Sequence, residues 1–260
     1  IHLSMTWGFH WALGPSAIWD ALGLPQSVNR MEQEGASVPK WVKDWLADGN
    51  TAFYHSSNGI RNVASGGVWK KEEIPPEHLN LRTLSAQGAL IQANEGASLL
   101  DIGEGVLCVE LHSPKSVIAG DILTMIQQGV EEAEARYEAL VIASEGRNFC
   151  VGANLMLLLM EAQDEEWDEI ERIIRLFQDT MLRLKYCKKP VVAAPYNMTL
   201  GGGVELCLAA DHVCAAAETY YGLVEVGVGL IPAGGGCKEL TVRLSKALAD
   251  KPDIDVQPYV

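Results

Sequence analysis

Leu200-Gly201-Gly202-Gly203-Val204-Glu205-Leu206 is the segment that decides the fold, because three glycines and a single acid interrupt an otherwise apolar region. An apolar run at 191–194 precedes it and favours a strand, so the glycines lie where a strand gives way to a helix. Backbone N–H groups at the start of a helix have no partner within the helix, and the helix dipole favours negative charge there. The segment therefore predicts a backbone site for an anionic group.

A second glycine turn, Asn148-Phe149-Cys150-Val151-Gly152-Ala153-Asn154, follows another apolar run at 139–143. Two such turns that face each other can hold an oxyanion between two N–H donors, and loss of one donor costs about 3 kcal/mol of transition-state stabilisation. Taken singly, each turn is better explained by tight packing of a helix on a strand. Neither matches the G-x-G-x-x-G pattern with a downstream acid, so the sequence does not favour a dinucleotide site.

Two glutamates stand in apolar surroundings beside these turns. Glu205 is the only charge between Leu200 and Ala210, and Glu225 is the only charge between Tyr221 and Pro232. An ionised carboxylate in such surroundings is costly unless it is paired. A carboxyl group that stays partly protonated near neutral pH can act as a general acid, and its neighbour as a general base. One glutamate alone would favour a half-exposed position at the end of an element, whereas the pair favours catalysis.

Other polar residues give weaker signals. The six histidines have no partner spacing, and the acids between 164 and 171 open a helix, where they suit its dipole. Lys115 and the apolar run at 155–160 could line a ligand tunnel, although a core role for the run is equally favoured.

From about residue 97 the sequence alternates strands with helices, which predicts an α/β fold with right-handed crossovers and a mostly parallel sheet. A hairpin is expected across Gly103-Glu104-Gly105. Strands are expected at 98–101, 106–111, 139–143, 191–194 and 212–216, and helices at 122–137, 163–186 and 203–210.

The first part of the chain has a different texture. Residues 1–50 are helical in pattern and contain five of the seven tryptophans (Trp7, Trp11, Trp19, Trp41, Trp45). So short a segment cannot bury all five by itself. Residues 51–96 carry turn signals such as Ser65-Gly66-Gly67, and we interpret them as a linker wrapped on a surface.

Composition excludes several classes of partner. The formal net charge of −14 argues against nucleic acid and against an anionic membrane surface. No apolar run approaches the ~20 residues that span a bilayer. The six cysteines are scattered without metal-ligand spacing, which indicates reduced thiols, no metal site and a cytoplasmic location.

The two glycine turns, Glu225 and the segment Gly229-Leu230-Ile231-Pro232-Ala233-Gly234-Gly235-Gly236 together resemble the three signatures of the crotonase (enoyl-CoA hydratase/isomerase) superfamily over about 97–240. The resemblance implies a spiral of βαβ units and an acyl-CoA thioester as substrate, with no cofactor needed for hydration. It implies catalytic roles for Glu205, which would position and activate water, and for Glu225, which would protonate C2. It also implies an oxyanion hole made by the N–H groups of Val151 and Gly202, and substrate contacts at Phe149, Gly152, Ala153, Asn154 and Gly201.

The sequence departs from this family at three points. Asn154 replaces an aspartate and Val151 a small residue, changes that backbone donation tolerates but that alter substrate fit. Only about two dozen residues follow Gly236, so we expect domain 97–260 to be truncated at its C-terminus. The helices missing there would build an oligomer in the family, which leaves a homo-oligomer open for a longer protein.

The segments at 7–15 and 18–23 resemble the C-terminal helical part of 3-hydroxyacyl-CoA dehydrogenases. The order suggests a fragment of a bifunctional β-oxidation enzyme, with NAD needed only by a dehydrogenase domain that this chain lacks. Three functions stay open: an enoyl-CoA hydratase, a Δ3,Δ2-enoyl-CoA isomerase, and a non-catalytic acyl-CoA-binding fragment. The presence of both glutamates favours the hydratase.

Overall fold

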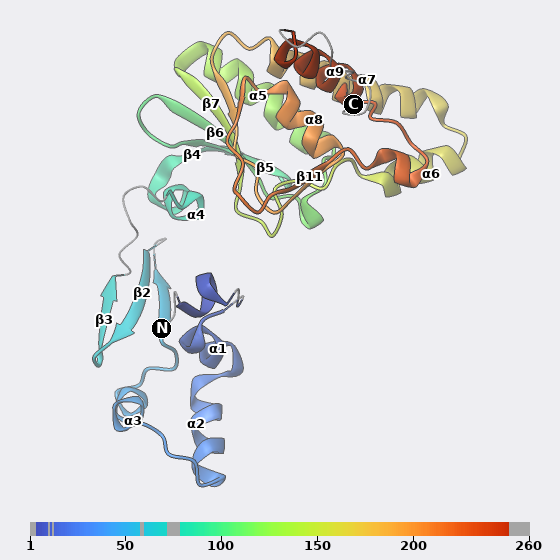
Figure 1. Ribbon diagram of the computed structural model, residues 1–260. Coiled ribbons are helices and arrows are strands. Elements are labelled where there is room, and N and C mark those ends of the chain that lie inside the picture. Colours follow the sequence, from blue (N-terminus) through green and yellow to red (C-terminus); the bar gives the residue numbers. More distant parts are fainter. Residues whose placement is uncertain (1–3, 10, 12, 58–59, 72–78, 250–260) are drawn as a thin grey trace. The chain divides into compact units, whose positions relative to one another are not determined.

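A computed structural model describes residues 4–9, 11, 13–57, 60–71 and 79–249. The chain divides into two compact units, Ile1–Gln87 and Gly88–Val260 (Figure 1). The remaining residues, among them His10, Ala12 and the tail beyond 249, lie outside the described part of the chain.

The second unit is built on a six-stranded sheet with the strand order β10-β8-β7-β6-β5-β4. Strands β6, β7, β8 and β10 are parallel, and β4 and β5 extend the sheet by antiparallel pairing. The bounds are β4 Leu90–Ala93, β5 Ala97–Asp101, β6 Val106–Leu111, β7 Ala139–Ser144, β8 Val191–Ala193 and β10 His212–Val213. This arrangement confirms the predicted α/β fold with a mostly parallel sheet and a hairpin from β5 to β6.

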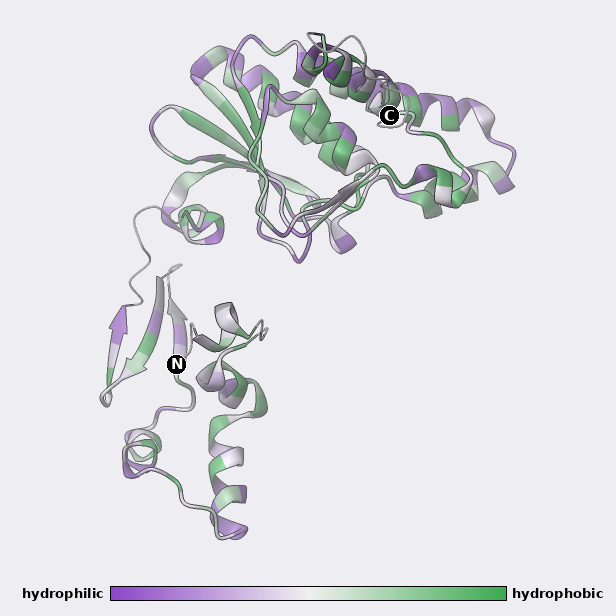
Figure 2. Cartoon of the chain, viewed as in Figure 1, coloured by the Kyte–Doolittle hydropathy of each residue, from purple (hydrophilic) through white to green (hydrophobic). Residues whose placement is uncertain are grey.

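Helices connect the parallel strands and build the site. They are α5 Gly120–Arg136, α6 Leu155–Gln163, α7 Trp167–Lys185, α8 Gly202–Ala209 and α9 Gly236–Ala247. Helix α5 joins β6 to β7 and packs on both of them and on α7. It approaches closely because Gly129 faces the sheet, where a Cβ atom would lie 2.6 Å from Cγ2 of Val109. The strands and α8 are strongly apolar (Figure 2), and together with α5 they supply most of one continuous core.

Two predicted elements differ in extent from the structure. The long helix expected at 163–186 begins later, at Trp167 of α7, because the chain turns after α6 with Glu165 at a φ of 60°. The strand expected at 212–216 ends at Val213, since only two residues pair with β8. A separate pair of parallel strands, β9 (Met198–Leu200) and β11 (Tyr220–Gly222), flanks the glycine turn at 200–206.

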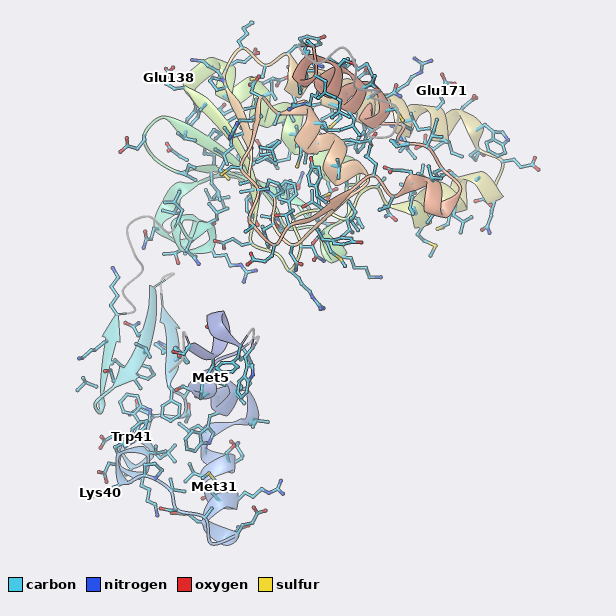
Figure 3. All side chains as sticks on the ribbon, viewed as in Figure 1. Met5, Met31, Lys40, Trp41, Glu138 and Glu171 are labelled. Carbon is cyan, nitrogen blue, oxygen red and sulfur yellow. The ribbon has the colours of Figure 1, made fainter. Side chains whose placement is uncertain are left out.

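The first unit contains helices α1 (Pro15–Leu22), α2 (Leu24–Gln33) and α3 (Lys40–Ala47), together with η1 (Ser4–Gly8). Its small core consists of Leu24, Val28, Val38, Val42, Trp45 and Phe53. Trp41, labelled in Figure 3, packs its ring 5.4 Å from that of Phe53 but remains half exposed.

The stretch 51–96, interpreted from sequence as a linker, holds regular elements. Strands β1 (Tyr54–Ser57), β2 (Ile60–Ser65) and β3 (Val68–Lys71) form an antiparallel sheet in the first unit. Gly66 and Gly67 both have positive φ, so the signal at this point is a hairpin turn and not a linker. The end of the stretch holds α4 (Leu81–Leu84), η2 (Ser85–Ala89) and β4, and β4 joins the large sheet of the second unit.

Candidate active site

The two glycine turns lie side by side in the second unit. Cys150 of the turn at 148–154 bridges Thr199 of β9, with N–H···O distances of 3.2 Å from Cys150 to Met198 and 2.9 Å from Leu200 to Cys150. A Cβ atom on Gly203 would lie 2.5 Å from the Cys150 carbonyl oxygen. The glycine at 203 is therefore what lets α8 begin directly against the turn at 148–154.

The starting residues of α8 are set by glycine conformations that other residues rarely adopt. Gly152 has a φ of 100° and Gly201 a φ of 53°. A Cβ atom on Gly152 would lie 3.2 Å from the nitrogen of Gly202, and one on Gly202 would lie 3.4 Å from the nitrogen of Ala153. The N–H groups of Ala153 and Gly202 are consequently close neighbours.

The predicted oxyanion donor at Val151 is wrong, because its N–H already donates to the Ser116 carbonyl at 2.8 Å. Gly152 and Asn154, on either side of Ala153, both bond to Ile118. The Gly152 carbonyl accepts the Ile118 N–H at 2.8 Å, and the Asn154 N–H donates to the Ile118 carbonyl at 3.2 Å. Ala153, between them, directs its N–H to the opposite side. Within the described part of the chain, neither Ala153 nor Gly202 donates to a backbone carbonyl. These two N–H groups are the pair that the geometry offers to an oxyanion.

Glu205 lies in the wholly buried helix α8 and is 5% exposed. Its Oε1 accepts the N–H of Gly236 at 2.8 Å. Burial raises the pKa of this carboxyl above its ordinary value; the Gly236 N–H opposes that rise, and the neighbouring Glu225 charge adds to it. Glu205 is therefore a carboxyl group that can hold a proton closer to neutrality than an exposed glutamate.

Glu225 opens the short 3-10 helix η4 (Glu225–Val228). Its Oε1 lies 3.0 Å from the position that a Cβ atom would take on Gly201, directly beside the start of α8. Its Oε2 is buried and has no hydrogen-bond partner among the described residues. Buried polar atoms of this kind call for an explanation, and an acid that serves a bound ligand provides one.

The two carboxylates share one apolar cavity of about 300 Å³. Among the described residues, Glu205 and Glu225 are the polar side chains that line it; the other lining residues are Ala153, Leu155, Leu158, Ile173, Ile174, Phe177, Gly202, Leu230, Ile231, Ala233 and Gly234. The structure thus brings both predicted acids and the two free N–H groups to the same space.

A larger cavity of about 550 Å³ adjoins this one, since Ala153 and Leu155 line both. Its wall includes Lys115, at a φ of 61°, and Asn154. The Asn154 side chain also caps α6 by accepting the Leu157 N–H at 3.4 Å.

The predicted substrate contact at Phe149 is not supported by its position, because the side chain is 1% exposed and belongs to the core. Gly152 and Gly201 act through their backbone conformations. Sequence reasoning missed Phe177, whose ring borders the positions of Cβ atoms on Gly202 and Gly234. Its place on an amphipathic helix gave no sign that it reaches the site.

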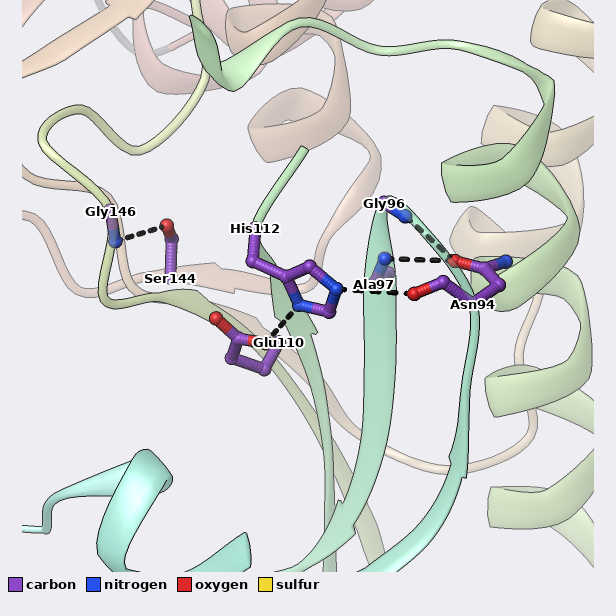
Figure 4. A network of polar contacts seen from close by, with 7 residues as sticks. All are labelled: Asn94, Gly96, Ala97, Glu110, His112, Ser144 and Gly146. Atoms are coloured by element: carbon purple, nitrogen blue, oxygen red, sulfur yellow. Dashed lines mark hydrogen bonds and ion pairs between the residues drawn. The ribbon is translucent and has the colours of Figure 1, made fainter. Parts of the chain in front are cut away.

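A polar network outside the cavity ties the edge of the sheet together (Figure 4). His112 Nδ1 lies 2.6 Å from Glu110 Oε2, and its Nε2 lies 3.2 Å from the Asn94 carbonyl. Asn94 Oδ1 in turn accepts the N–H groups of Gly96 and Ala97 at 3.0 and 2.9 Å. These contacts hold the β4–β5 turn against β6 and give His112 a structural role.

No group of three potential metal ligands occurs in the described part of the chain. Nor does any helix there have the length and apolarity to cross a membrane.

The fold and the paired acids define an α/β protein with a two-carboxylate cavity at the start of helix α8, and comparison with known proteins places it in a family. The family described as Enoyl-CoA hydratase/isomerase matches residues 101–252, and the chain belongs to that family. A solved enoyl-CoA hydratase from Polaromonas sp. JS666 is 28% identical, with a TM-score of 0.52, over 63% of this chain and 62% of that one. An enoyl-CoA hydratase from Bacillus anthracis is 25% identical, with a TM-score of 0.52, over 58% and 61%.

Among curated relatives, a Bacillus subtilis protein provisionally named a 3-hydroxyacyl-CoA dehydrogenase is 49% identical over 94% of this chain. A Rickettsia felis protein, provisionally named a fatty acid oxidation complex trifunctional enzyme, is 34% identical over 60% of it. The chain spans 31% of the first relative's length and 22% of the second's.

Proposed function

We propose that this chain carries an enoyl-CoA hydratase site that adds water across the 2,3 double bond of a 2-enoyl-CoA. The observation that carries the proposal is the shared cavity, in which the buried Glu205 and the half-buried Glu225 stand beside two N–H groups that donate to no backbone carbonyl in the described chain. Two acids suit hydration, because one can take the proton of the attacking water while the other delivers a proton to carbon.

In this mechanism the thioester oxygen accepts the N–H groups of Ala153 and Gly202. Negative charge that develops on that oxygen as water attacks C3 is stabilised by the two donors and by the start of α8. Because its pKa is raised toward the working pH, the ionised form of Glu205 is a stronger base than an exposed glutamate. It takes a proton from the attacking water, and the electron pair of the double bond moves toward the thioester to form an enolate. Glu225 then supplies the proton to C2. Before the next cycle, Glu205 releases its proton to water and Glu225 takes one up, so both carboxyl groups return to their starting states.

The lining of the cavity favours a plain aliphatic acyl group. Relatives named methylglutaconyl-CoA hydratase, such as the Rattus norvegicus protein, are 30% identical over 52% of the chain. A substrate with a second carboxylate would need a basic partner, and no Lys, Arg or His is among the described residues that line the acyl cavity. The adjoining larger cavity, which contains Lys115, suits the anionic coenzyme A carrier.

The wider context is part of the same proposal. The Bacillus subtilis and Rickettsia felis relatives are named for dehydrogenation and fatty acid oxidation, and both are much longer than this chain. These names, with the dehydrogenase-like segments before residue 24, support an origin in a multifunctional β-oxidation protein. NAD would then serve a dehydrogenase domain and not the hydratase site.

The test is the loss of the enoyl-thioester absorbance of crotonyl-CoA, followed with the wild-type chain, Glu205→Gln and Glu225→Gln. The exposed Glu218→Gln provides a matched control. Turnover to 3-hydroxybutyryl-CoA by the wild type and the control, but by neither active-site variant, would support the proposal. Turnover that survives both substitutions would refute the carboxylate mechanism. Conversion of a 3-enoyl-CoA to the 2-enoyl isomer without hydration would favour an isomerase instead.

A further inference from the structure

The turn that holds Glu205 is attached to helix α7 at both of its ends. On one side, Gln178 donates from Nε2 to the Ala233 carbonyl at 2.7 Å. On the other side, Lys185 pairs with the carboxylate of Glu239 in the first turns of α9. Between these two attachments lie Gly234, Gly235 and Gly236, and the last of them donates its N–H to Glu205.

A further cavity of about 230 Å³, here called the rear cavity, borders this turn and Glu205. It is lined by Gln178, Met181, Leu182, Lys185, Glu205, Ala209, Gly234, Gly235, Lys238 and Glu239. Glu205 and Gly234 line both cavities. Side chains also pack on the turn itself, with Phe177 against Gly234, and Pro232 and Leu223 against Gly236. The two attachments to α7 add polar contacts at each end of this packed turn.

Glu239 is 7% exposed, which is unusual for a charged side chain. Lys185 pairs with one carboxylate oxygen, and the exposed Lys238 lies 3.0 Å from the other. Burial of an ion pair is a weak source of stability, because desolvation offsets the attraction, whereas it fixes geometry well. Only the Glu239 carboxylate of this pair is buried, since Lys185 is partly exposed. The Glu239 N–H also donates to the Gly235 carbonyl at 2.9 Å, so the ion pair is coupled directly to the turn.

We propose that Lys185 and Gln178 of α7 are positioning residues for the general base, holding the Gly234–Gly236 turn so that the Gly236 N–H stays on Glu205. This inference rests on the proposed role of Glu205. The charged groups that face Glu205 are Glu225 on the acyl side, and Lys185, Lys238 and Glu239 across the rear cavity. Loosening the turn removes the donor that favours the ionised carboxylate, so the pKa of Glu205 rises further.

The experiment compares the pH profile of kcat/KM for crotonyl-CoA hydration in Lys185→Met, Gln178→Leu and the wild type. We expect the acid limb to move upward by about one pH unit in each variant, a roughly tenfold loss of kcat/KM on that limb. Gln178→Leu tests the same turn without any change of charge and at an exposed position, so it remains informative if Lys185→Met does not fold. Lys185→Arg should restore the wild-type profile.

Lys238→Met is the matched control, because it removes a cation from the same carboxylate but leaves the attachment to α7 intact. An unmoved profile in this control supports positioning, and a shift as large as that of Lys185→Met would overturn it in favour of simple charge loss. Unmoved profiles in both Lys185→Met and Gln178→Leu would also overturn it. If the wild type does not hydrate crotonyl-CoA, the proposed function fails. Infrared titration of the Glu205 carboxyl then tests the positioning inference on its own, with the same variants compared. The Glu205 band is identified by subtraction of the Glu205→Gln spectrum.

Discussion

Oε1 of Glu225 lies 3.0 Å from the position that a Cβ atom would take on Gly201. This closeness relates the acid that we assign to C2 protonation to the residue that precedes Gly202, the proposed oxyanion donor. The Gly201 N–H donates to the Gly222 carbonyl at 2.9 Å, which fixes the strand leading to Glu225 against the same turn. The glycine at 201 is thus required by backbone conformation and by the place of the acid together.

Gly201→Ala should lower activity more than it lowers stability. Alanine at a φ of 53° and a ψ of −122° is strained by about 1–3 kcal/mol, and its methyl group would push the Glu225 carboxylate aside. Because small misplacements of catalytic groups cost up to about 100-fold, we expect kcat for crotonyl-CoA to fall tenfold or more. Gly120→Ala, where a Cβ atom would meet nothing within 4 Å, should leave kcat unchanged. Equal activity in the two variants would contradict the proposed place of Glu225.

Glu205→Gln should stabilise the protein at alkaline pH. Burial raises the folded-state pKa of Glu205 above its unfolded value, so the folded protein binds the proton more tightly. The associated stability is present below the unfolded pKa of about 4.3 and is lost as pH rises through the higher folded pKa. Glutamine carries no charge to desolvate, and its Tm should exceed that of wild type at pH 8, by a difference that shrinks toward pH 4.5. A difference that does not depend on pH would contradict this assignment, and Glu218→Gln should show none.

The alternation of apolar runs and helical periods was enough to predict the parallel sheet, because strands such as β6 and β7 are mostly apolar and have no fully exposed position. The break between α6 and α7 was not predictable, since Glu165 adopts a positive φ without a glycine or proline signal. The hairpin at Gly66-Gly67 was interpreted as part of a linker because its strands are short and, in β3, exposed on both faces.

The acids of the site were predictable and the second oxyanion donor was not. A charge in an apolar run identifies Glu205 and Glu225 without any knowledge of contacts. Which N–H in the turn is free depends on a strand-like bridge between Ile118 and Ala153, formed by segments 35 positions apart in the sequence. The segment that forms this bridge also supplies the Ser116 carbonyl, which accepts the Val151 N–H. Nothing in the sequence of the turn itself indicates that hydrogen bond.

Phe177→Ala should destabilise the second unit and weaken substrate binding. The ring is nearly buried on α7, lines the acyl cavity and borders Gly202 and Gly234. Deleting a buried phenylalanine costs about 3–5 kcal/mol, and the enlarged cavity should raise KM for short acyl groups. Trp167→Ala, on the same helix but 62% exposed, should change stability little. Urea unfolding followed by circular dichroism measures both variants, and similar losses in the two would contradict the role given to Phe177.

Asp20→Ala should unfold the first unit without affecting the second. The Asp20 carboxylate accepts the Phe53 N–H at 2.8 and 2.9 Å and the Tyr54 N–H at 2.9 Å, which fixes α1 to the start of β1. Loss of charged acceptors from such bonds costs about 1.5–3 kcal/mol each, a large share of what so small a core can supply. Tryptophan fluorescence should report a lower midpoint for the first unit, because Trp19 and Trp41 pack on Phe53. Asp44→Ala, an exposed change on α3, is the control.

Two compact units can unfold in separate transitions, so crotonyl-CoA hydration should persist at the temperature at which the fluorescence of Asp20→Ala changes. Loss of both signals together would instead show that the second unit depends on the first unit for its own stability.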